Sequence, residues 1–369
     1  MNRVLVFGMT GNPGGVENFL MNYCRHFDRN RIRMDFLCNF LEKAACEDEL
    51  VSMGSRVFHI VSRRKNPLRY RKELAAFFAG HAAEYDAIWV NVSSLANIDY
   101  LRAAKKYGID RRIIHSHNSQ NMDGCLRGLL HRLNRGLVGK YATDFWACSW
   151  GAAGWFYNDR LIARTVIIHN AIEVENYIFD PEKRHDIREK LHIEGKYVIG
   201  NVGRLHFQKN QSFAIDIFAR YLKTDEDTVL VLVGRGEDEA MLKDKAKQAG
   251  ITDRIIFAGV QSDMQAWLSA FDVFLFPSVF EGLSIAALEA QANGLPILAS
   301  VDALPQEARL NDNIHVMELK NYAENWAQEI RRIKEHDGRK DAGDVRRTFT
   351  QNGYDISTEA GKIERYLLR

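Results

Sequence analysis

Two glutamates eight residues apart follow an apolar run in the second half of the sequence. Residues 273–276 are apolar, Pro277 ends the run, and a turn with Gly282 leads into a helical pattern that reaches Glu289. The free N–H groups and the dipole of a helix start form a site for an anion. Glu281 and Glu289 could each accept hydrogen bonds from vicinal hydroxyls, which sugars offer. The alternative is a strand–turn–helix with two ordinary surface glutamates.

Two cationic side chains follow another predicted strand, residues 198–202. Arg204 comes directly after Gly203, and Lys209 stands five positions further on. The planar fork of a guanidinium and the point charge of an ammonium both suit phosphate oxygens. In a single loop such residues more commonly form surface ion pairs. Two cations beside a strand end, opposite a helix N-terminus, indicate a diphosphate.

A glycine-rich loop lies between the first predicted strand and the first predicted helix. Its glycines, Gly11, Gly14 and Gly15, do not match the G-x-G-x-x-G pattern of dinucleotide-binding enzymes. An NAD-dependent dehydrogenase is therefore disfavoured.

His115 and His117 follow a third predicted strand, and two histidines in a loop could bind a metal ion. The pattern supplies no nearby cysteine or acidic partner for them. We expect no metal cofactor, and the alternative for each histidine is a structural role with a hydrogen bond to the backbone.

Short apolar strands alternate with amphipathic helical segments along the chain. The first helix is predicted from apolar residues at positions i, i+3, i+4 and i+7, namely Val16, Phe19, Leu20 and Tyr23. Near-continuous apolar strands separated by helices indicate parallel sheets covered on both faces. A length of 369 residues exceeds one ordinary core. We predict an α/β protein with two Rossmann-like domains facing a cleft, a linker over 172–181 and a new set of elements from Val166. The predicted strands are 4–7, 87–90, 112–114, 198–202, 229–233, 255–257, 273–276 and 297–299.

The composition is that of an ordinary globular protein, with 46% hydrophobic and 27% charged residues. Residues 1–170 hold 24 basic and 15 acidic residues, so the first half is basic and the second acidic. This asymmetry suggests an anionic surface or ligand for the first half, or a chance distribution of solvated charge. Five cysteines without a CxxC pair fit a reducing compartment. The stretch 145–158 is too short to span a bilayer, so a cytoplasmic protein, soluble or peripheral, is expected, with no nucleic-acid partner.

Together these segments resemble the retaining glycosyltransferases of family 4, which have the two-domain GT-B fold. Glu281 and Glu289 match the family's E-x7-E motif, Gly203 and Arg204 with Lys209 its G-R-x…K motif, and residues 14–17 its G-G-x-E loop. The segments H-S-H-N, A-C-S, E-A-Q and G-L-P are similar to those of the branch that builds bacterial exopolysaccharide and capsule. Two positions depart from the family: Ser284, where Gly or Pro is frequent, and Arg235, where an acidic residue is common.

The resemblance implies an acceptor-side domain over 1–170, a nucleotide-sugar domain over 171–350 and a returning C-terminal helix over 351–369. It implies transfer of a hexose-type sugar from a nucleotide diphosphate donor, with a UDP-sugar favoured, to a glycan or lipid-linked acceptor. Arg204 and Lys209 would hold the diphosphate, Glu281 and His117 would contact the donor sugar, and Glu289 would bind the ribose. The donor-binding set would be Gly14, Gly15, Glu17, Gly203, Gly234, Ser278, Gly282, Leu283, Ser284 and Glu289.

Two other functions stay open at this point. One is a GT-B nucleotide-sugar epimerase, which needs no acceptor. The other is a non-catalytic partner subunit that binds a nucleotide sugar, which the four intact residues Arg204, Lys209, Glu281 and Glu289 disfavour.

A basic amphipathic segment in the first half predicts docking on an anionic membrane surface. Its leucines fall at helical spacing, and arginines occupy much of the remaining surface. The alternative is that the leucine face is buried against the sheet and the arginines are solvated. The leucines are Leu126, Leu129, Leu130, Leu133 and Leu137, and the arginines are Arg127, Arg132 and Arg135.

Overall fold

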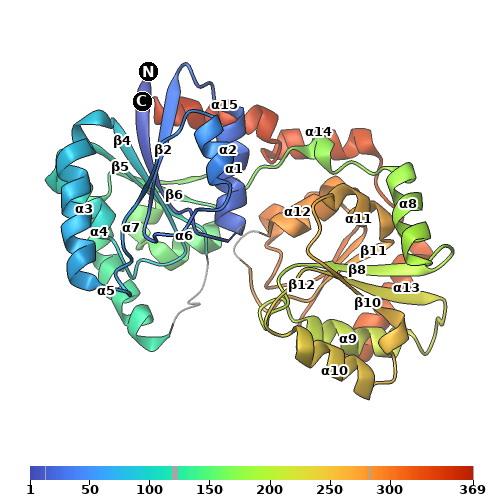
Figure 1. Ribbon diagram of the computed structural model, residues 1–369. Coiled ribbons are helices and arrows are strands. Elements are labelled where there is room, and N and C mark those ends of the chain that lie inside the picture. Colours follow the sequence, from blue (N-terminus) through green and yellow to red (C-terminus); the bar gives the residue numbers. More distant parts are fainter. Residues whose placement is uncertain (13, 119–123, 282–283, 369) are drawn as a thin grey trace. The chain divides into compact units, whose positions relative to one another are not determined.

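The chain forms two compact units, each built on its own parallel sheet (Figure 1). The structure, a computed structural model, describes residues 1–12, 14–118, 124–281 and 284–368. The first unit is Met1–Ala171 together with Ile356–Arg369, and the second is Ile172–Asp355. The predicted α/β class with two Rossmann-like domains is confirmed. The two units divide after residues 171 and 355, and the sequence analysis expected boundaries after 170 and 350.

The first unit contains a seven-stranded sheet in the order β3-β2-β1-β4-β5-β6-β7, with every neighbouring pair parallel. The strand order reverses between β1 and β4, the place where ligands of such sheets bind. The prediction that a new set of elements begins at Val166 is wrong, because β7 pairs with β6. The strands are β1 Asn2–Phe7, β2 Ile32–Cys38, β3 Val57–His59, β4 Ala87–Val92, β5 Arg111–Ser116, β6 Asp144–Ala147 and β7 Thr165–Ile167.

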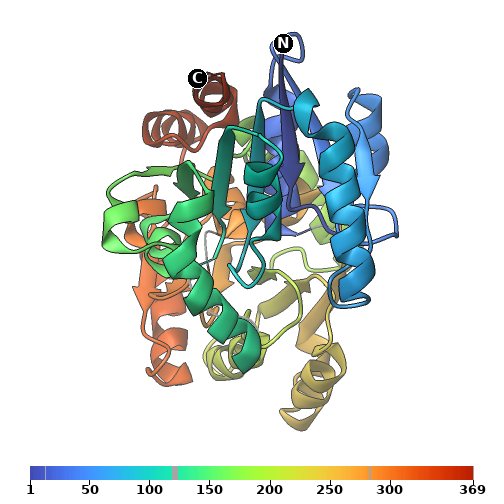
Figure 2. The ribbon, with the colours of Figure 1, turned by 90° about the vertical axis from the view of Figure 1, so that its left-hand side faces the viewer.

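Helices cover both faces of this sheet. On one face, α1 buries Phe19, Leu20 and Tyr23, with Val16 packed at the edge of the same core, as its spacing predicted. The C-terminal helix α15 joins this core and lies beside α1 (Figure 1). The opposite face, turned to the viewer in Figure 2, carries α3, α4 and α5. The helices are α1 Gly15–His26, α2 Glu47–Ser52, α3 Pro67–His81, α4 Asp99–Lys106, α5 Cys125–Tyr141, α6 Trp150–Phe156, α7 Asp159–Ile162 and α15 Ile356–Leu367.

The second unit repeats the arrangement with six parallel strands in the order β10-β9-β8-β11-β12-β13. Its order reverses between β8 and β11. One face is covered by α9, α10 and α13, which bury residues such as Ile215, Leu242 and Ile330. The five strands predicted in this half correspond to β8–β12. The strands are β8 Tyr197–Val202, β9 Thr228–Val233, β10 Ile255–Gly259, β11 Val273–Phe276, β12 Ile297–Ser300 and β13 Ile314–Met317; the helices are α8 Pro181–Leu191, α9 Gln211–Tyr221, α10 Glu239–Gln248, α11 Met264–Ala270, α12 Ile285–Ala292, α13 Ala323–His336 and α14 Ala342–Asn352.

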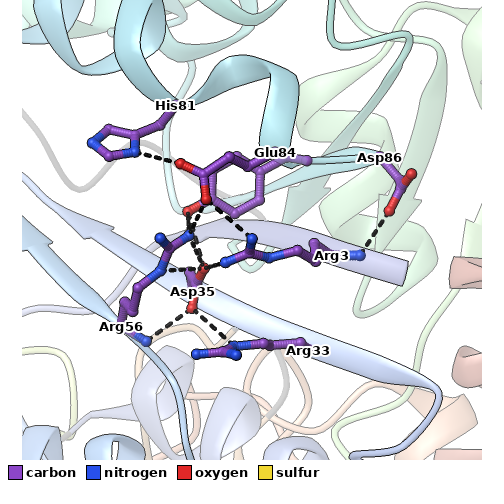
Figure 3. A network of polar contacts seen from close by, with 8 residues as sticks. Arg3, Arg33, Asp35, Arg56, His81, Glu84 and Asp86 are labelled. Atoms are coloured by element: carbon purple, nitrogen blue, oxygen red, sulfur yellow. Dashed lines mark hydrogen bonds and ion pairs between the residues drawn. The ribbon is translucent and has the colours of Figure 1, made fainter. Parts of the chain in front are cut away.

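A charged network joins the first strands of the first sheet near their amino ends (Figure 3). The Asp35 side chain is fully buried, with one oxygen 3.1 Å from Arg3 and 2.7 Å from Arg56. The hydroxyl of Tyr85 donates to the same oxygen at 3.1 Å. Burial alone would raise the pKa of the Asp35 carboxyl, but the hydrogen bonds and charge of Arg56 and the Tyr85 hydroxyl lower it below its usual value. The network therefore needs the ionised carboxylate.

We expect Asp35→Asn to lower the free energy of unfolding by about 1.5–3 kcal/mol, since it removes the buried carboxylate and leaves Arg3 and Arg56 with the partly exposed Glu84 as their remaining carboxylate in the network. The matched control is Glu49→Gln, which removes an exposed partner of Arg25 at 2.7 Å and should cost less than about 1 kcal/mol. Urea denaturation measures both. The difference between wild type and Asp35→Asn should shrink as the pH falls below 3.8. A pH-independent difference would contradict the electrostatic origin.

Candidate functional site

The loops that follow β8 and β11 meet at the carboxyl edge of the second sheet, at its switch point. Lys209 Nζ lies 2.7 Å from Glu281 Oε1, and the two side chains are only 18% and 8% exposed. Gln208 Nε2 donates to the Phe280 carbonyl at 3.0 Å. Asn210 Nδ2 donates to the Pro277 carbonyl at 3.1 Å. The two loops are thus fixed to each other by one ion pair and several hydrogen bonds.

Glycines let a third loop, after β9, pack against the loop after β8. A Cβ at Gly234, where φ is +136°, would lie 2.0 Å from the Gly203 carbonyl oxygen. A Cβ at Gly236 would lie 2.1 Å from the Leu205 carbonyl oxygen. Leu205 N donates to the Arg235 carbonyl at 3.1 Å across this contact. Gly234, which the sequence suggested as ligand-contacting, therefore has a packing role of its own, whereas a Cβ at Gly203 would meet the Lys209 side chain at 3.1 Å.

Arg204 projects from the same edge and pairs with a carboxylate that the sequence did not suggest. Its Nε lies 3.0 Å from Glu237 Oε2, with the two side chains 68% and 48% exposed. His206 Nε2 lies 3.4 Å from the other oxygen of Glu237. The sequence does show Glu237 as an acidic residue three positions after Gly234. Its pairing with Arg204, however, depends on how the loops after β8 and β9 pack, which the sequence does not reveal. Because this pair is well exposed, an anionic ligand can displace the carboxylate at little cost.

The start of α12 lies next to these loops along the chain. Ser284 is the N-cap residue and is buried, and Ser278 is fully buried, with its carbonyl accepting from the Ser300 hydroxyl. The first amides of a helix have no partner within that helix and favour anions. The predicted contacts Gly282 and Leu283 lie outside the described residues.

Glu289 is buried within α12, 9% exposed. Burial raises the pKa of its carboxyl from 4.5 to about 7, and a hydrogen bond with the Tyr177 side chain opposes the rise. A buried carboxyl with a perturbed pKa at the end of a sheet's switch-point connection is a candidate for ligand binding.

In the first unit, the β1–α1 loop is held by a buried carboxylate. Glu17, 4% exposed, accepts a hydrogen bond from Thr10 N at 2.9 Å. A Cβ at Gly14 would lie 2.9 Å from the other Glu17 oxygen, whereas a Cβ at Gly15 would meet open space. Glu17 therefore shapes the loop, and Gly15 marks where its backbone is accessible.

His117 lies at the carboxyl edge of the same sheet. Its Nε2 is 2.9 Å from the side-chain oxygen of Asn91. Burial lowers the pKa of the imidazole to about 3, so the ring is neutral. A neutral ring that donates from Nε2 to Asn91 presents Nδ1 as an acceptor.

His115 packs in an aromatic cluster behind His117. Its ring lies 4.1 Å from His117, 5.1 Å from Phe19 and 6.0 Å from Trp89, centroid to centroid. Neither ring nitrogen has a hydrogen-bond partner within the described part of the chain, so the backbone bond expected for a structural histidine is absent here. Burial and then the neighbouring His117 lower the pKa of His115 well below its usual value. His115 is a neutral packing residue.

The described residues contain neither a cluster of metal ligands nor a helix that could span a membrane. Within residues 1–12, 14–118, 124–281 and 284–368, no group of three His, Cys, Asp or Glu side chains could hold a metal ion. Over the same residues, none of the helices has the length and apolarity needed to cross a bilayer.

Four of the five predicted leucines of α5 face outward, contrary to the alternative that the sheet buries them, and Leu130 is half-buried. Leu126 is 72%, Leu129 55%, Leu133 59% and Leu137 41% exposed. The buried side of the helix consists instead of His131, Asn134 and Val138. Arg127 and Arg132 are exposed. Arg135 is half-buried and donates to the Tyr157 carbonyl at 2.6 Å, so it anchors the helix.

Comparison with known proteins finds a family match in the second unit. Residues 183–355 match the family model of glycosyl transferases group 1. The chain is 27% identical over 372 residues to the proposed glycosyltransferase EpsF of Bacillus subtilis (strain 168), covering 95% of this chain and 92% of that protein. A shorter match, 34% identical over 141 residues and 36% of each chain, is to the UDP-Gal:alpha-D-GlcNAc-diphosphoundecaprenol alpha-1,3-galactosyltransferase of Escherichia coli.

A solved structure has the same fold over the whole chain. Anabaena Alr3699/HepE, crystallised with UDP and glucose, aligns with a TM-score of 0.80 at 19% identity, covering 100% of this chain and 99% of that one. The two parallel-sheet units thus form the GT-B fold.

The raised pKa of Glu289 predicts how stability depends on pH. Between pH 4.5 and about 7 the unfolded chain releases a proton that the folded chain keeps, so this carboxyl destabilises the fold progressively as the pH rises. We expect Glu289→Gln to become more stable relative to wild type by about 3 kcal/mol between pH 4 and pH 8. Urea denaturation across that range measures it. The control Glu239→Gln, in an exposed pair with Lys243, should show almost no such trend, and parallel profiles for all three proteins would refute the assignment.

Proposed function

We propose that this chain, which carries a glycosyltransferase group 1 domain, transfers a hexose-type sugar from a UDP-sugar with retention of anomeric configuration. The acceptor is a hydroxyl of a glycan or of a lipid-linked sugar, in the synthesis of a bacterial surface polysaccharide. The observation that carries the proposal is that Arg204 and Lys209 stand at the β8/β11 switch point, each held in place by a carboxylate.

The two cations act on the diphosphate of the donor. Arg204 exchanges the exposed Glu237 carboxylate for phosphate oxygens, and Lys209 contributes its charge from beside Glu281. The amides at the start of α12 add neutral donors on the same edge. Once the donor is bound, these groups are already in place for the negative charge that develops on the departing phosphate. Stabilisation by such preorganised groups often contributes more to catalysis than any other effect. This arrangement accounts for the charge without a metal ion.

The remaining predicted residues act on hydroxyl groups. Glu289 binds the ribose hydroxyls, and Glu281 lies by the donor sugar hydroxyls. His117 accepts a hydrogen bond from the donor sugar through Nδ1, because Asn91 already engages Nε2. Gly14 and Gly15 give the β1–α1 loop a backbone that can approach the ligand.

Retention follows from a front-face path. The bond between the anomeric carbon and the phosphate oxygen breaks as the bond to the acceptor oxygen forms on the same face. The departing phosphate oxygen takes the proton of the acceptor hydroxyl, so UDP leaves with that proton and no protein nucleophile is needed. Similarity to a galactosyltransferase named for a UDP-sugar donor and a diphospholipid acceptor, and to a structure with bound UDP, supports this choice of substrates.

A lipid-linked acceptor also gives the outer face of α5 a role. We assign its leucine stripe and the exposed Arg127 and Arg132 to reversible docking on the anionic inner face of the plasma membrane. Apolar side chains enter the interface while each nearby cation contributes about 1 kcal/mol.

Removing either cation tests the donor site. Arg204→Ala and Lys209→Ala should each lower the rate of UDP-sugar turnover roughly ten- to hundredfold, since a charge-assisted hydrogen bond contributes about 1.5–3 kcal/mol. Glu237→Gln should tighten UDP binding, because it removes the carboxylate that competes for Arg204. The matched control is Arg220→Ala, which breaks an equally exposed pair with Glu324 at 3.0 Å and should leave the rate unchanged. Hydrolysis of UDP-sugars and calorimetry with UDP measure these effects, and wild-type rates for both Arg204→Ala and Lys209→Ala would refute the site.

Membrane docking is tested with liposomes. The double variant Leu129→Ser and Leu133→Ser should lose most co-sedimentation with anionic vesicles at low salt while keeping its melting temperature, because both side chains are exposed. Salt should release the wild-type protein by screening the arginines. The control Leu41→Ser changes another exposed leucine, 51% exposed, outside α5. If wild type ignores anionic vesicles at low ionic strength, the membrane role is wrong.

A further inference from the structure

Two buried amide side chains join the loop that carries Arg204 and Lys209 to the second sheet. Asn201 belongs to β8 and Gln211 is the first residue of α9, and each is only 1% exposed. Gln211 Nε2 donates to Asn201 Oδ1 at 3.3 Å, and Asn201 Nδ2 donates to the Leu275 carbonyl of β11 at 2.8 Å. The pair therefore connects α9 with β8 and β11, the two strands between which the strand order reverses.

Gln211 also binds the backbone of the loop itself. Its Nε2 donates to the Arg204 carbonyl at 3.1 Å, and its Oε1 accepts from His206 N at 3.4 Å. Arg204 and His206 are the two residues whose side chains contact Glu237. One buried side chain thus holds the backbone of both residues that meet this carboxylate.

The far end of the loop is fixed by a second contact with the chain after β11. Asn210 has a φ of +56°, in the left-handed region that asparagine enters more readily than most other residues with a side chain. Its Nδ2 donates to the Pro277 carbonyl at 3.1 Å. The chain direction between Lys209 and the start of α9 is therefore set by tertiary contacts.

The side chain of Gln211 suits its place because it donates and accepts at once. The Arg204 carbonyl needs a donor and the His206 N–H needs an acceptor, and a primary amide supplies both. An apolar side chain of similar size would fill the same volume but would leave both backbone groups without these partners. Burying a polar side chain costs free energy unless its hydrogen bonds are made, so the two amides are explained by the loop that they hold.

We infer that Gln211 is a positioning residue that places Arg204 for the diphosphate, with Asn201 holding its amide in the required orientation. The inference rests on the proposed transferase function and adds residues that act on the donor only through the loop. The Arg204 side chain is 68% exposed, so packing against neighbours does little to direct it. The place from which its guanidinium reaches out is set by its backbone, which Gln211 fixes.

A double-mutant cycle on UDP binding tests this. Gln211→Met fills a similar volume without the hydrogen bonds and should weaken calorimetric UDP binding about three- to tenfold. In the Arg204→Ala background the same substitution should change UDP binding by less than about twofold, because a residue that acts through Arg204 has no effect once that side chain is gone. A merely structural role would weaken UDP binding equally in both backgrounds.

The matched control is another buried amide of the second unit. Asn313 is 2% exposed, and its Nδ2 donates to the Gly294 and Gly338 carbonyls at 3.0 Å each. Asn313→Leu should lower the melting temperature, as Gln211→Met does, but leave UDP binding unchanged. If Gln211→Met does not fold, Gln211→Glu makes the same comparison, because an ionised carboxylate of the same size cannot donate to the Arg204 carbonyl.

The outcomes separate the positioning role from the donor site. A loss that appears with Arg204 present and disappears without it supports the inference. Equal losses in both backgrounds, no loss, or the same loss in Asn313→Leu overturns it, while the effect of Arg204→Ala alone still reports on the donor site. If the wild-type protein does not bind UDP, the proposed function is refuted and this inference with it.

Discussion

The ion pair between Lys209 and Glu281 is the interaction on which the second unit's site depends. Parallel strands bring the loops after β8 and β11 to one edge, but only specific contacts fix them there. Removing two charges from water costs several kcal/mol, and a 2.7 Å contact between nearly buried partners offsets that cost only because both are present. Glu281 is thus needed by the fold as well as by the proposed chemistry. Losing either partner would remove this ion pair from the two loops that precede α12.

Glycine packing gives this edge its shape. Only residues without a Cβ allow the loop after β9 to approach the loop after β8, since a methyl group at Gly234 or Gly236 would overlap backbone atoms about 2 Å away. The approach brings Glu237 to Arg204 across the edge. One cation is therefore held tightly by a buried carboxylate and the other loosely by an exposed one. The site needs both pairs. The buried Lys209–Glu281 pair fixes the geometry of the loops, and Arg204 can exchange the exposed Glu237 carboxylate for a ligand.

The sequence predicted the strands with the clearest apolar runs and missed β2, β3, β6, β7 and β13. The apolar strands β1, β4, β5 and β8–β12 follow from their residues alone. The strand β2 contains Arg33 and Asp35, and a buried aspartate is compatible with a strand only when Arg3 and Arg56 come from other parts of the chain to neutralise it. The Arg204–Glu237 pair escaped prediction for the same reason. Motif spacing identified candidates on single loops, whereas the contacts that join two loops depend on tertiary structure.

Helix α5 departs from the usual pattern of a helix that covers a sheet. Two of its three buried residues are polar: His131 and Asn134 bond the loop after β4, where an ordinary amphipathic helix would bury leucines. The leucines are consequently displaced to the outer surface, where their exposure is unfavourable in water unless something apolar covers them. The same helix thus presents its exposed leucines, with Arg127 and Arg132, to the outside. Because His131 and Asn134 bond α5 to the loop after β4, the proposed membrane contact is joined rigidly to the carboxyl edge of the first sheet, the edge that carries His117.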